Sequence, residues 1–431
     1  MKIAVVALGK IGLPLAVQFA MKGHHVIGSD VNQKTVDLVN LGIEPFPGEA
    51  HLDEHLKKVV ESGHLKATVD TVDAVANAEA VVIVVPLFVD SDGLPDFGWM
   101  DAATEKIAQG LKPGTLVSYE TTLPIGTTRN RFAPAIEKIS GLKAGLDFSL
   151  VFSPERVLTG RIFADLRKYP KLVGGINESS TKVGIDFYKA VLDFDERPDL
   201  SEKNGVWDLL TCEASEMAKL AETTYRDVNI ALANQFAIYA ETANIDIAKV
   251  IAASNSQPFS HIHQPGIAVG GHCIPVYPRF YLWNDPQATI VRSAREANAG
   301  MPQHAVSILA GALGSLKDAK IAVLGVSYRG GVKESAFSGV FPTVDALKEA
   351  GAIVLVHDPM YTNREILELG FTPYAIGNSV DGVILQADHA EYKELSSKDF
   401  PGLKTIVDGR RTLTPENFIG VSFRVIGGPK D

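Results

Sequence analysis

Short apolar runs separated by amphipathic stretches are the main pattern in the N-terminal half of the chain. Runs of this kind are typical of strands that are buried on both faces of a parallel sheet. Their alternation with helical patterns predicts an α/β fold with a doubly wound sheet. The runs are IAVVAL at 3–8, HHVIGSD at 24–30, AVVIVVP at 80–86, GTLVSYETTLP at 114–124 and FSLVFSPERVLTG at 148–160.

A glycine turn follows the first run, and a helical pattern and a second strand come after it. This order is the layout of a dinucleotide-binding βαβ unit, in which an acidic residue, here Asp30, ends the second strand. Gly9 would let the backbone approach the pyrophosphate at the helix N-terminus, with Lys10 and Ile11 in the same turn. Gly12 would allow the helix to pack closely on the strand.

Asp30 indicates which cofactor this turn accepts. It lies 18 residues after Gly12, where a carboxylate accepts a hydrogen bond from a ribose 2′-OH and repels a 2′-phosphate. No arginine follows it, so the turn predicts NAD rather than NADP. Ala7 stands at the first glycine position of G-x-G-x-x-G, where alanine is tolerable if its φ stays negative. The alternative is an α/β unit that binds no nucleotide.

Polar residues follow the ends of the later strands. Ligands of doubly wound sheets lie beyond the carboxyl ends of the strands, so Pro86 and Thr121 are predicted to contact the cofactor. Thr122 and Glu155 are predicted to lie at the edge of the same site. A glutamate there can act as a general base toward water. The alternative for Glu155 is a carboxylate that starts a helix.

Residues 213–244 contain no proline or glycine and predict one long helix. Its apolar positions occupy more than one face, which is common in helices that bridge domains or form a dimer interface. Lys219, Thr223 and Arg226 follow one another at i, i+4 and i+7 and form a polar stripe. The lysine could be catalytic, or it could be an ordinary solvated charge. A further single helix is predicted over 293–313.

An irregular stretch at 257–282 carries Gly270-Gly271-His272-Cys273. Glycines let the backbone come close to a ligand, and backbone N–H groups in such a turn can face a reacting oxygen. Cys273 is therefore a candidate nucleophile, although free cysteines are more often small core residues. The nearby histidines lack the ligand spacing of a zinc site, so no metal is predicted.

The last part of the chain opens a second strand and glycine turn at 320–331, without the dinucleotide spacing. Further strands are predicted in VLVHDP at 354–359, GVILQAD at 382–388 and TIVDGRR at 405–411. A second α/β half without a dinucleotide turn suits a different nucleotide. Arg329, Lys333 and Arg411 are candidates for phosphate contacts, and the alternative for each is a surface charge.

Length and composition bound the remaining possibilities. A chain of 431 residues predicts several domains, which we place at 1–204, 205–312 and 313–431, with a long-helix domain joining two Rossmann-like domains. The net charge of −10 argues against a nucleic-acid partner. Two cysteines fit a reducing cytoplasm. Glycines and a lysine break the N-terminal apolar run, so neither a signal peptide nor a membrane span is predicted.

Seven segments, in order along nearly the whole chain, resemble the UDP-glucose/GDP-mannose dehydrogenase superfamily of nucleotide-sugar 6-dehydrogenases. The resemblance implies an N-terminal NAD domain, a central helical domain that forms a homodimer, and a C-terminal domain that binds the UDP-sugar. The segments are ALGKIGLP, ETTLP, SPERVLTGRI, EMAKLAETTYRDVNIALAN, PGIAVGGHCIPV, AREANAGMP and VLGVSYRG.

The resemblance also implies a reaction and the roles of residues in it. The C6 hydroxyl of a UDP-hexose is oxidised twice by NAD, through a thiohemiacetal and a thioester on Cys273. Glu155 matches the residue that activates water, and Lys219 matches the lysine that stabilises oxyanions. Thr122 matches the threonine that orients the water. The residues implied to contact substrate are Arg156, Val157, Leu158, Arg226, Gly270, Gly271, Arg329 and Arg411.

The form PERVL resembles the branch that acts on UDP-N-acetylhexosamines, which favours UDP-N-acetylmannosamine or UDP-N-acetylglucosamine. Thr223 and Tyr277 stand where the family usually has asparagine and aspartate, and Ala336 and Gly339 where it commonly has arginine and proline. The alternatives are a two-electron oxidoreductase on a related UDP-sugar and a catalytically silent nucleotide-sugar-binding protein.

Overall fold

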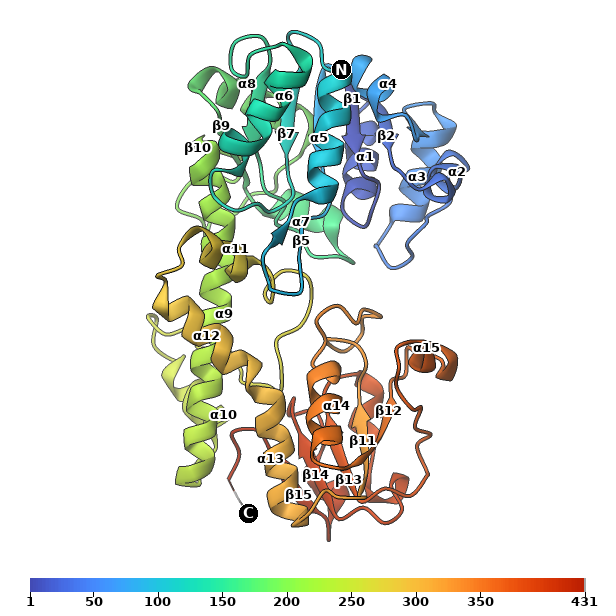
Figure 1. Cartoon of the computed structure of the whole chain (residues 1–431), viewed down its shortest axis with the longest axis vertical. Helices are drawn as coiled ribbons and strands as arrows, with labels where there is room; N and C mark the ends of the chain where they lie inside the picture. The colour runs from blue at the N-terminus through green and yellow to red at the C-terminus, as the bar shows by residue number, and fades with distance from the viewer. Residues whose placement is uncertain (430–431) are drawn as a thin grey trace. The chain divides into compact units, whose positions relative to one another are not determined.

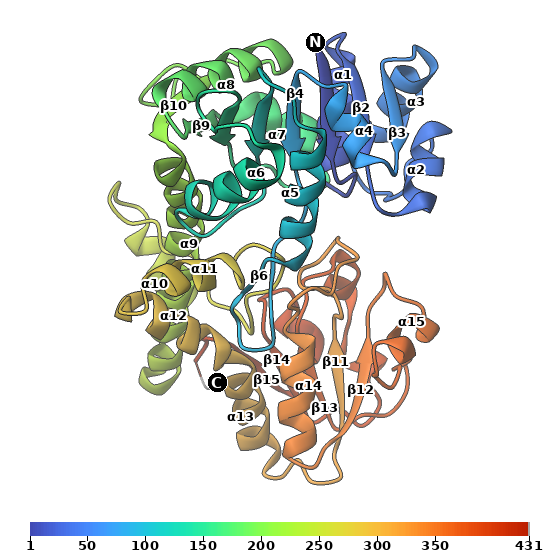
Figure 2. The ribbon, with the colours of Figure 1, turned by 45° about the horizontal axis from the view of Figure 1, so that its top comes forward.

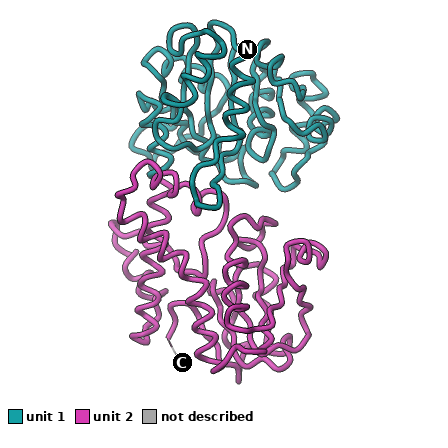
Figure 3. The backbone as a smooth tube through the Cα atoms, viewed as in Figure 1, with its two compact units in different colours: residues 1–221 teal, residues 222–431 magenta. Residues whose placement is uncertain are grey.

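A computed structural model describes residues 1–429. The chain forms two compact units, residues 1–221 and 222–431 (Figure 3). The last two residues of the second unit, which also end the predicted 313–431 domain, lie outside the described residues. These two units do not test the predicted division into three domains, which remains a prediction. No helix in the described part of the chain combines the length and the apolar character that crossing a membrane requires.

The first unit contains an eight-stranded sheet in the order β10-β9-β8-β7-β4-β1-β2-β3. Every neighbouring pair is parallel except β8 and β9. All five predicted apolar runs contain a strand, whereas β3, β9 and β10 were not predicted. The strands are β1 (Lys2–Val6), β2 (His25–Ser29), β3 (Leu65–Thr68), β4 (Ala80–Ile83), β7 (Leu116–Tyr119), β8 (Ser149–Phe152), β9 (Lys171–Gly175) and β10 (Val206–Thr211).

Helices cover both faces of this sheet. One face shares a core with α1, α3, α7 and α8, and Phe19 meets Phe187 edge-on there at 5.8 Å between ring centroids. On the other face α5 packs between α4 and α6 (Figures 1 and 2). The elements are α1 (Gly12–Met21), α2 (Gln33–Asn40), α3 (Leu52–Glu61), α4 (Thr71–Ala76), the hairpin β5 (Phe88–Val89) and β6 (Pro95–Asp96), α5 (Gly98–Gly110), the π-helix η1 (Thr128–Phe132), α6 (Ala133–Ser140), α7 (Ile162–Lys168) and α8 (Glu178–Val191).

The predicted long helix is confirmed as α9 (Cys212–Ala243). The prediction of one helix over 293–313 was wrong, because α12 (Thr289–Ala299) ends at Gly300 and α13 (Met301–Leu313) begins after it. Pro302 has no N–H and fits only the first turn of a helix. The stretch at 257–282 is irregular only in its first part, since α11 (Tyr277–Asn284) begins within it. A shorter helix, α10 (Ile247–Ser254), follows α9.

The second unit contains a parallel five-stranded sheet in the order β12-β11-β13-β14-β15. Helices α13 and α14 share a core with one face, and the aromatic residues Tyr374, Tyr392, Phe400 and Phe418 pack on the other. The predicted pair of Rossmann-like sheets is confirmed. The remaining elements are β11 (Lys320–Leu324), α14 (Val340–Glu349), β12 (Ile353–His357), α15 (Asn363–Glu368), β13 (Gly382–Leu385), the 3₁₀ turns η2 (Ala390–Glu394), η3 (Ser397–Asp399) and η4 (Pro415–Phe418), β14 (Thr405–Asp408) and β15 (Ser422–Val425).

Candidate active site

The turn between β1 and α1 has the shape of a phosphate cradle. A Cβ on Gly12 would lie 1.9 Å from the carbonyl oxygen of Ala7, so this position admits only glycine. A Cβ on Gly9 would meet no protein atom within 4 Å, which leaves the backbone accessible to a ligand. Lys10 is exposed beside it. The condition of a negative φ at Ala7 is not met, because its φ is +76°.

Asp30 follows β2 and is held by backbone donors from both sides. The N–H of Leu8 donates to Oδ2 at 2.8 Å, and the N–H of Asn32 donates to Oδ1 at 2.8 Å. These bonds fix the carboxylate beside the glycine turn, at the end of the strand next to β1. A ribose diol there would find an oriented acceptor, so the residues fit an NAD molecule.

The ends of β4 and β7 are tied together at the same edge of the sheet. The hydroxyl of Thr121 donates to the carbonyl oxygen of Val85 at 2.7 Å, which places Thr121 next to the segment of Pro86. Thr122 is buried directly after it. Since β4 is the neighbour of β1, these residues share the edge on which Gly9 and its turn lie.

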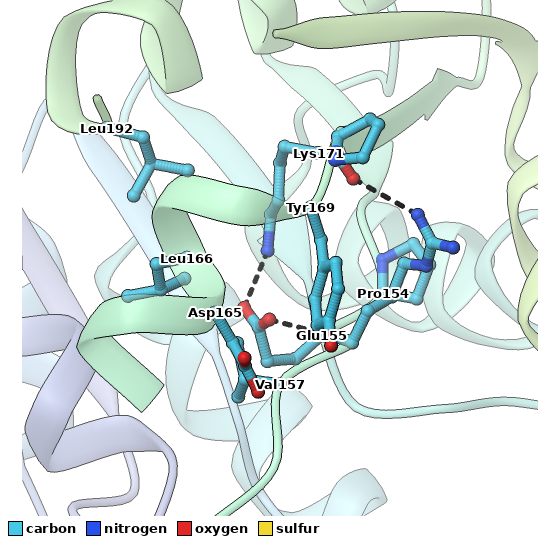
Figure 4. Close-up of a pocket in the computed structure, with 10 residues that line it drawn as sticks. Pro154, Glu155, Val157, Asp165, Leu166, Tyr169, Lys171 and Leu192 are labelled. Atoms are coloured by element: carbon cyan, nitrogen blue, oxygen red, sulfur yellow. Dashed lines mark hydrogen bonds and ion pairs between the residues drawn. The ribbon is translucent and has the colours of Figure 1, made fainter. Parts of the chain in front are cut away.

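Glu155, at the end of β8, contacts two residues that sequence reasoning missed. Lys171 Nζ lies 2.9 Å from Glu155 Oε2 (Figure 4). It also lies 2.6 Å from Glu120 Oε2. The Tyr188 hydroxyl, on α8, donates to Glu120 Oε1 at 2.7 Å. Only Glu120, in the segment ETT at a predicted strand end, gave any sequence signal. Lys171 begins a strand that the pattern did not show.

Burial and the lysine charge act in opposite directions on these groups. Burial raises the pKa of Glu120 to about 7, although Lys171 opposes this. Burial also acts to raise the pKa of Glu155, but Lys171 and the hydrogen bonds of Arg156 and Glu120 outweigh it and lower that pKa. Glu155 is therefore the more acidic carboxyl, and its ionised form is the one that can accept a proton from water.

The loop after Glu155 is held by carboxylates from elsewhere in the first unit. Glu49 accepts hydrogen bonds from the backbone N–H groups of Gly160 and Ile162, and Asp165 accepts one from Leu158 N at 3.0 Å. The guanidinium of Arg156 donates to the carbonyl oxygen of Pro170 at 3.3 Å. These bonds shape the predicted substrate loop.

A small hollow opens beside Glu155 and Lys171. It leaves about 10 Å³ for the centre of a water molecule, which is roughly the space that one water needs. A sugar is too large for it. It is lined by Pro154, Glu155, Arg156, Val157, Asp165, Leu166, Tyr169, Pro170, Lys171 and Leu192 (Figure 4).

Two of the three residues in the polar stripe on α9 are buried, which is unlike a solvated helix surface. Lys219 and Thr223 are both 6% exposed, whereas Arg226 is exposed. A long ammonium side chain is seldom buried without a functional or structural reason, so the alternative of an ordinary surface lysine does not hold. The predicted catalytic and substrate roles of the three residues remain predictions.

The segment around Cys273 is fixed within the second unit. The N–H of Tyr277 donates to Cys273 O at 2.9 Å, so the cysteine directly precedes the first turn of α11. Arg295, on α12, donates to Ile274 O at 3.3 Å and to Asp227 Oδ1 at 2.8 Å. The partly exposed Cys273 thiol therefore sits on a backbone that is held from two helices.

The glycines before the cysteine are explained by the packing of this unit. A Cβ on Gly270 would lie 2.6 Å from the Cβ of Tyr328, and Gly271 has φ +90°. Gly339 lets the segment approach in the same way, since a Cβ there would lie 2.4 Å from the Cβ of Ala268. This close approach accounts for glycine where the family commonly has proline. The predicted contact of Gly270 and Gly271 with the sugar remains a prediction.

The three cations predicted to bind phosphate all have contacts within the second unit. Arg329 lies against the ring and hydroxyl of Tyr328, and Lys333 pairs with Glu365 at 2.5 Å. Arg411 donates to Gly427 O at 3.0 Å and pairs with Asp246 at 2.9 Å. Their phosphate contacts remain predictions. Sequence reasoning missed the neighbouring Arg410, which donates to Ala268 O at 3.1 Å and ties β14 to the cysteine segment.

Metal ligands do not gather anywhere in residues 1–429. No group of three or more histidine, cysteine, aspartate or glutamate side chains in that range is arranged to hold a metal ion. The chemistry that the described residues can supply consists of a thiol, an ammonium group, a carboxylate base and a dinucleotide cradle.

Comparisons with known proteins identify the family. Models of the UDP-glucose/GDP-mannose dehydrogenase family match in order: the NAD binding domain over residues 1–192, the central domain over 213–300 and the UDP binding domain over 322–415. The UDP-N-acetyl-D-mannosamine dehydrogenase of Pyrococcus horikoshii is 34% identical over 436 residues, with 99% of each chain covered.

Solved structures agree with this assignment. The UDP-D-ManNAc dehydrogenase structure from Pyrococcus horikoshii matches with a TM-score of 0.87 at 33% identity, over 99% of each chain. The NDP-N-acetyl-D-galactosaminuronic acid dehydrogenase of Methanosarcina mazei Go1 matches with a TM-score of 0.84 at 29% identity, over 100% of this chain and 95% of that one. The predicted NAD cofactor and family are thereby confirmed. The chain belongs to the UDP-glucose/GDP-mannose dehydrogenase family and is an NAD-dependent nucleotide-sugar dehydrogenase.

Proposed function

We propose that this enzyme oxidises the C6 hydroxyl of a UDP-N-acetylhexosamine, UDP-N-acetylmannosamine in particular, to the uronate. The observation that carries the proposal is the full-length similarity to a UDP-N-acetyl-D-mannosamine dehydrogenase. The PERVL segment after β8 supports an N-acetylated sugar. Gly9, Asp30 and Thr121 would hold NAD at one edge of the first sheet, and the bound cofactor would supply the hydride acceptor for each of the two oxidations.

Cys273 keeps the intermediate attached to the enzyme. The first oxidation gives an aldehyde, and the thiolate of Cys273 adds to its carbonyl carbon to form a thiohemiacetal. Loss of a hydride from that carbon, with loss of the hydroxyl proton, gives the thioester. Lys219 stabilises the oxygen that carries negative charge in these steps, and Thr223 stands where the family places an amide for the same task.

Glu155 completes the reaction with water. It takes a proton from the water molecule that Thr122 orients while the water oxygen bonds to the thioester carbon. The carbon–sulfur bond then breaks, its electron pair stays on Cys273, and the uronate is released. Burial acts to raise the pKa of Glu155, but Lys171 and the hydrogen bonds of Arg156 and Glu120 together lower it, which keeps this carboxyl ionised near neutral pH.

Each of the three predicted domains has its own role in this reaction. Residues 1–204 hold NAD, residues 205–312 supply Cys273 and the dimer contact, and residues 313–431 hold the UDP-sugar with Arg329 and Arg411. Exposed apolar side chains along α9, among them Leu232 and Tyr239, support a homodimer. The two free cysteines support a cytoplasmic setting, where an activated uronate would supply polysaccharide biosynthesis.

NADH stoichiometry tests the proposal. Purified protein is given NAD and a panel of UDP- and GDP-sugars, and NADH and uronate are counted per sugar consumed. We expect two NADH per molecule of UDP-N-acetylmannosamine. A ratio of one would favour a two-electron oxidoreductase, and no turnover of any UDP-hexose would favour a silent binding protein.

A further inference from the structure

A buried lysine bridges two carboxylates at the ends of neighbouring strands. Lys171 Nζ lies 2.6 Å from Glu120 Oε2, after β7, and 2.9 Å from Glu155 Oε2, after β8. The side chains of Lys171, Glu120 and Glu155 are 5%, 0% and 11% exposed. The side chain of Glu155 is the most exposed of the three. Lys171 and Glu120 would therefore influence a reaction through their contacts with Glu155.

Both carboxylate oxygens of Glu155 accept hydrogen bonds. Lys171 donates to Oε2, and the backbone N–H of Arg156 donates to Oε1 at 2.7 Å. The backbone is also fixed, because Glu155 N donates to Glu120 O at 3.1 Å. A carboxylate held in this way keeps one orientation, which is what a general base needs in order to meet a water molecule repeatedly.

Glu120 and Lys171 are themselves enclosed by polar contacts. The Tyr188 hydroxyl donates to Glu120 Oε1 and lies 2.7 Å from the Ser118 hydroxyl oxygen. Lys171 Nζ lies 4.9 Å from the centroid of the Tyr188 ring. Charged side chains are tolerated in a protein interior when they are paired and hydrogen-bonded in this way. Glu120, Glu155 and Lys171 therefore form a well-defined buried cluster.

We propose that Lys171 is a positioning residue that aims and ionises Glu155, and that Glu120 balances the lysine charge so that Glu155 still accepts a proton. The proposal rests on the proposed role of Glu155 as the base that activates water. It assigns functions to a lysine and a glutamate that both contact the base.

The charges that face Glu155 come from three elements. Lys171 lies on β9, Glu120 follows β7, and the neutral Tyr188 lies on α8. Asp165 and Tyr169, which line the same hollow, are both bonded to Arg161. Two carboxylates around one ammonium carry one negative charge in excess, so a single proton makes the cluster neutral. Burial favours that proton on Glu120, the more buried partner, whereas Lys171 opposes protonation of both carboxyls.

Lys171→Met tests the proposal. Without the ammonium, Glu155 keeps the burial and the facing Glu120 carboxyl, which both favour its protonated form. The acid limb of the kcat–pH profile for uronate release should move to higher pH by about one unit or more, a loss of about tenfold at a pH on that limb. KM values for NAD and the UDP-sugar should stay within about twofold of wild type, because no bound ligand loses a contact.

The double variant Lys171→Met/Glu120→Gln leaves Glu155 as the one ionisable side chain of the three. It provides a second test if Lys171→Met fails to fold. It removes the second carboxyl with the lysine, so its acid limb should lie between those of wild type and Lys171→Met. Lys404→Met, which breaks the exposed pair with Asp381 at 2.8 Å, is the control and should leave the profile unchanged. An acid limb in Lys171→Met that matches wild type would overturn the role of Lys171, and a double variant shifted as far as the single one would overturn the role of Glu120.

A second readout separates this inference from the proposed function. In protein labelled with ¹³C at glutamate carboxyls, the infrared difference between wild type and Glu155→Gln reports the titration of Glu155 without any substrate. Repeating it in the Lys171→Met background should give a titration at higher pH. An unchanged titration refutes the inference even if the enzyme makes uronate, whereas the expected shift supports it even if no UDP-hexose is oxidised.

Discussion

The carbonyl oxygen of Ala7 points at Gly12, and a Cβ added to Gly12 would lie 1.9 Å from it. Ala7 can direct its carbonyl there because it adopts φ +76°. Its own N–H donates to Ser29 O at 2.8 Å, which holds it in that conformation. A left-handed alanine therefore replaces the usual glycine, and the strain is offset by this bond and by the fit of Gly12.

Gly9→Ala and Gly12→Ala should separate ligand binding from folding. Gly12→Ala forces the backbone of the turn apart, and we expect a loss of about 3 kcal/mol or more in the free energy of unfolding. Gly9→Ala meets no protein atom within 4 Å, so it should fold normally but bind NAD at least about tenfold more weakly. Urea unfolding and NAD titration by calorimetry measure both. Wild-type NAD affinity in Gly9→Ala would contradict the placement of the pyrophosphate.

Asp30→Asn should relax the choice of cofactor. The substitution keeps the shape of the side chain and removes the charge that repels a 2′-phosphate, so the NADP-to-NAD ratio of kcat/KM should rise by about tenfold, or about 1.4 kcal/mol. One of the backbone donors to Asp30 loses its acceptor, so stability should fall slightly. Asp37→Asn, an exposed carboxyl on α2, is the control. An unchanged ratio in Asp30→Asn would show that another group selects NAD.

Cys273→Ser should abolish uronate formation. A serine hydroxyl is a far weaker nucleophile than a thiolate at neutral pH, so no thioester forms. Cys212→Ser is the matched control, because Cys212 is buried and its thiol donates to Gly174 O at 3.4 Å. Product analysis by mass spectrometry should find uronate from Cys212→Ser alone. Uronate from Cys273→Ser at the wild-type rate would refute the thioester mechanism.

Local patterns predicted the long helix and most strands of both sheets, because each of those elements shows its apolar pattern within its own residues. The network around Glu155 was beyond such reasoning. Glu120, Glu155 and Lys171 meet because β7, β8 and β9 lie side by side, and no spacing in the sequence states that order. The left-handed Ala7 was missed for a related reason, since its conformation is set by contacts with Ser29 and Gly12. The break at Gly300 could have been predicted from Pro302.

The outer face of α9 should hold two subunits together. Tyr225, Leu232, Phe236 and Tyr239 follow one another at intervals of seven, four and three residues and are 58%, 46%, 39% and 70% exposed. Such spacing places them on one side of a helix. Leu232→Glu/Tyr239→Glu should give a monomer in sedimentation equilibrium, whereas Ile419→Glu, at an exposed apolar position far along the chain, should not. A double variant that remains dimeric would place the interface elsewhere.

Glu216, on the first turns of α9, should make stability depend on pH in an unusual direction. It accepts hydrogen bonds from Gly126 N and from both Thr128 N and Thr128 Oγ1, and burial raises its pKa to about 7 from an ordinary value of 4.5. Between those values the folded state binds a proton that the unfolded state has lost. The free energy of unfolding should therefore fall as the pH rises through this window.

Glu216→Gln removes this titration and leaves the rest of the chain unchanged. Urea unfolding at pH 5 and pH 7 gives the free energy of unfolding of wild type and of Glu216→Gln. The difference between the two proteins should be about 2 kcal/mol smaller at pH 7 than at pH 5. Glu213→Gln is the matched control one turn away. Burial acts to raise the pKa of Glu213, but its bond with Arg129 lowers it, so its contribution is present above pH 4.5 and lost as the pH falls. Its difference should therefore stay constant between pH 5 and pH 7. A Glu216→Gln difference that does not change with pH would mean that Glu216 is ionised throughout this window.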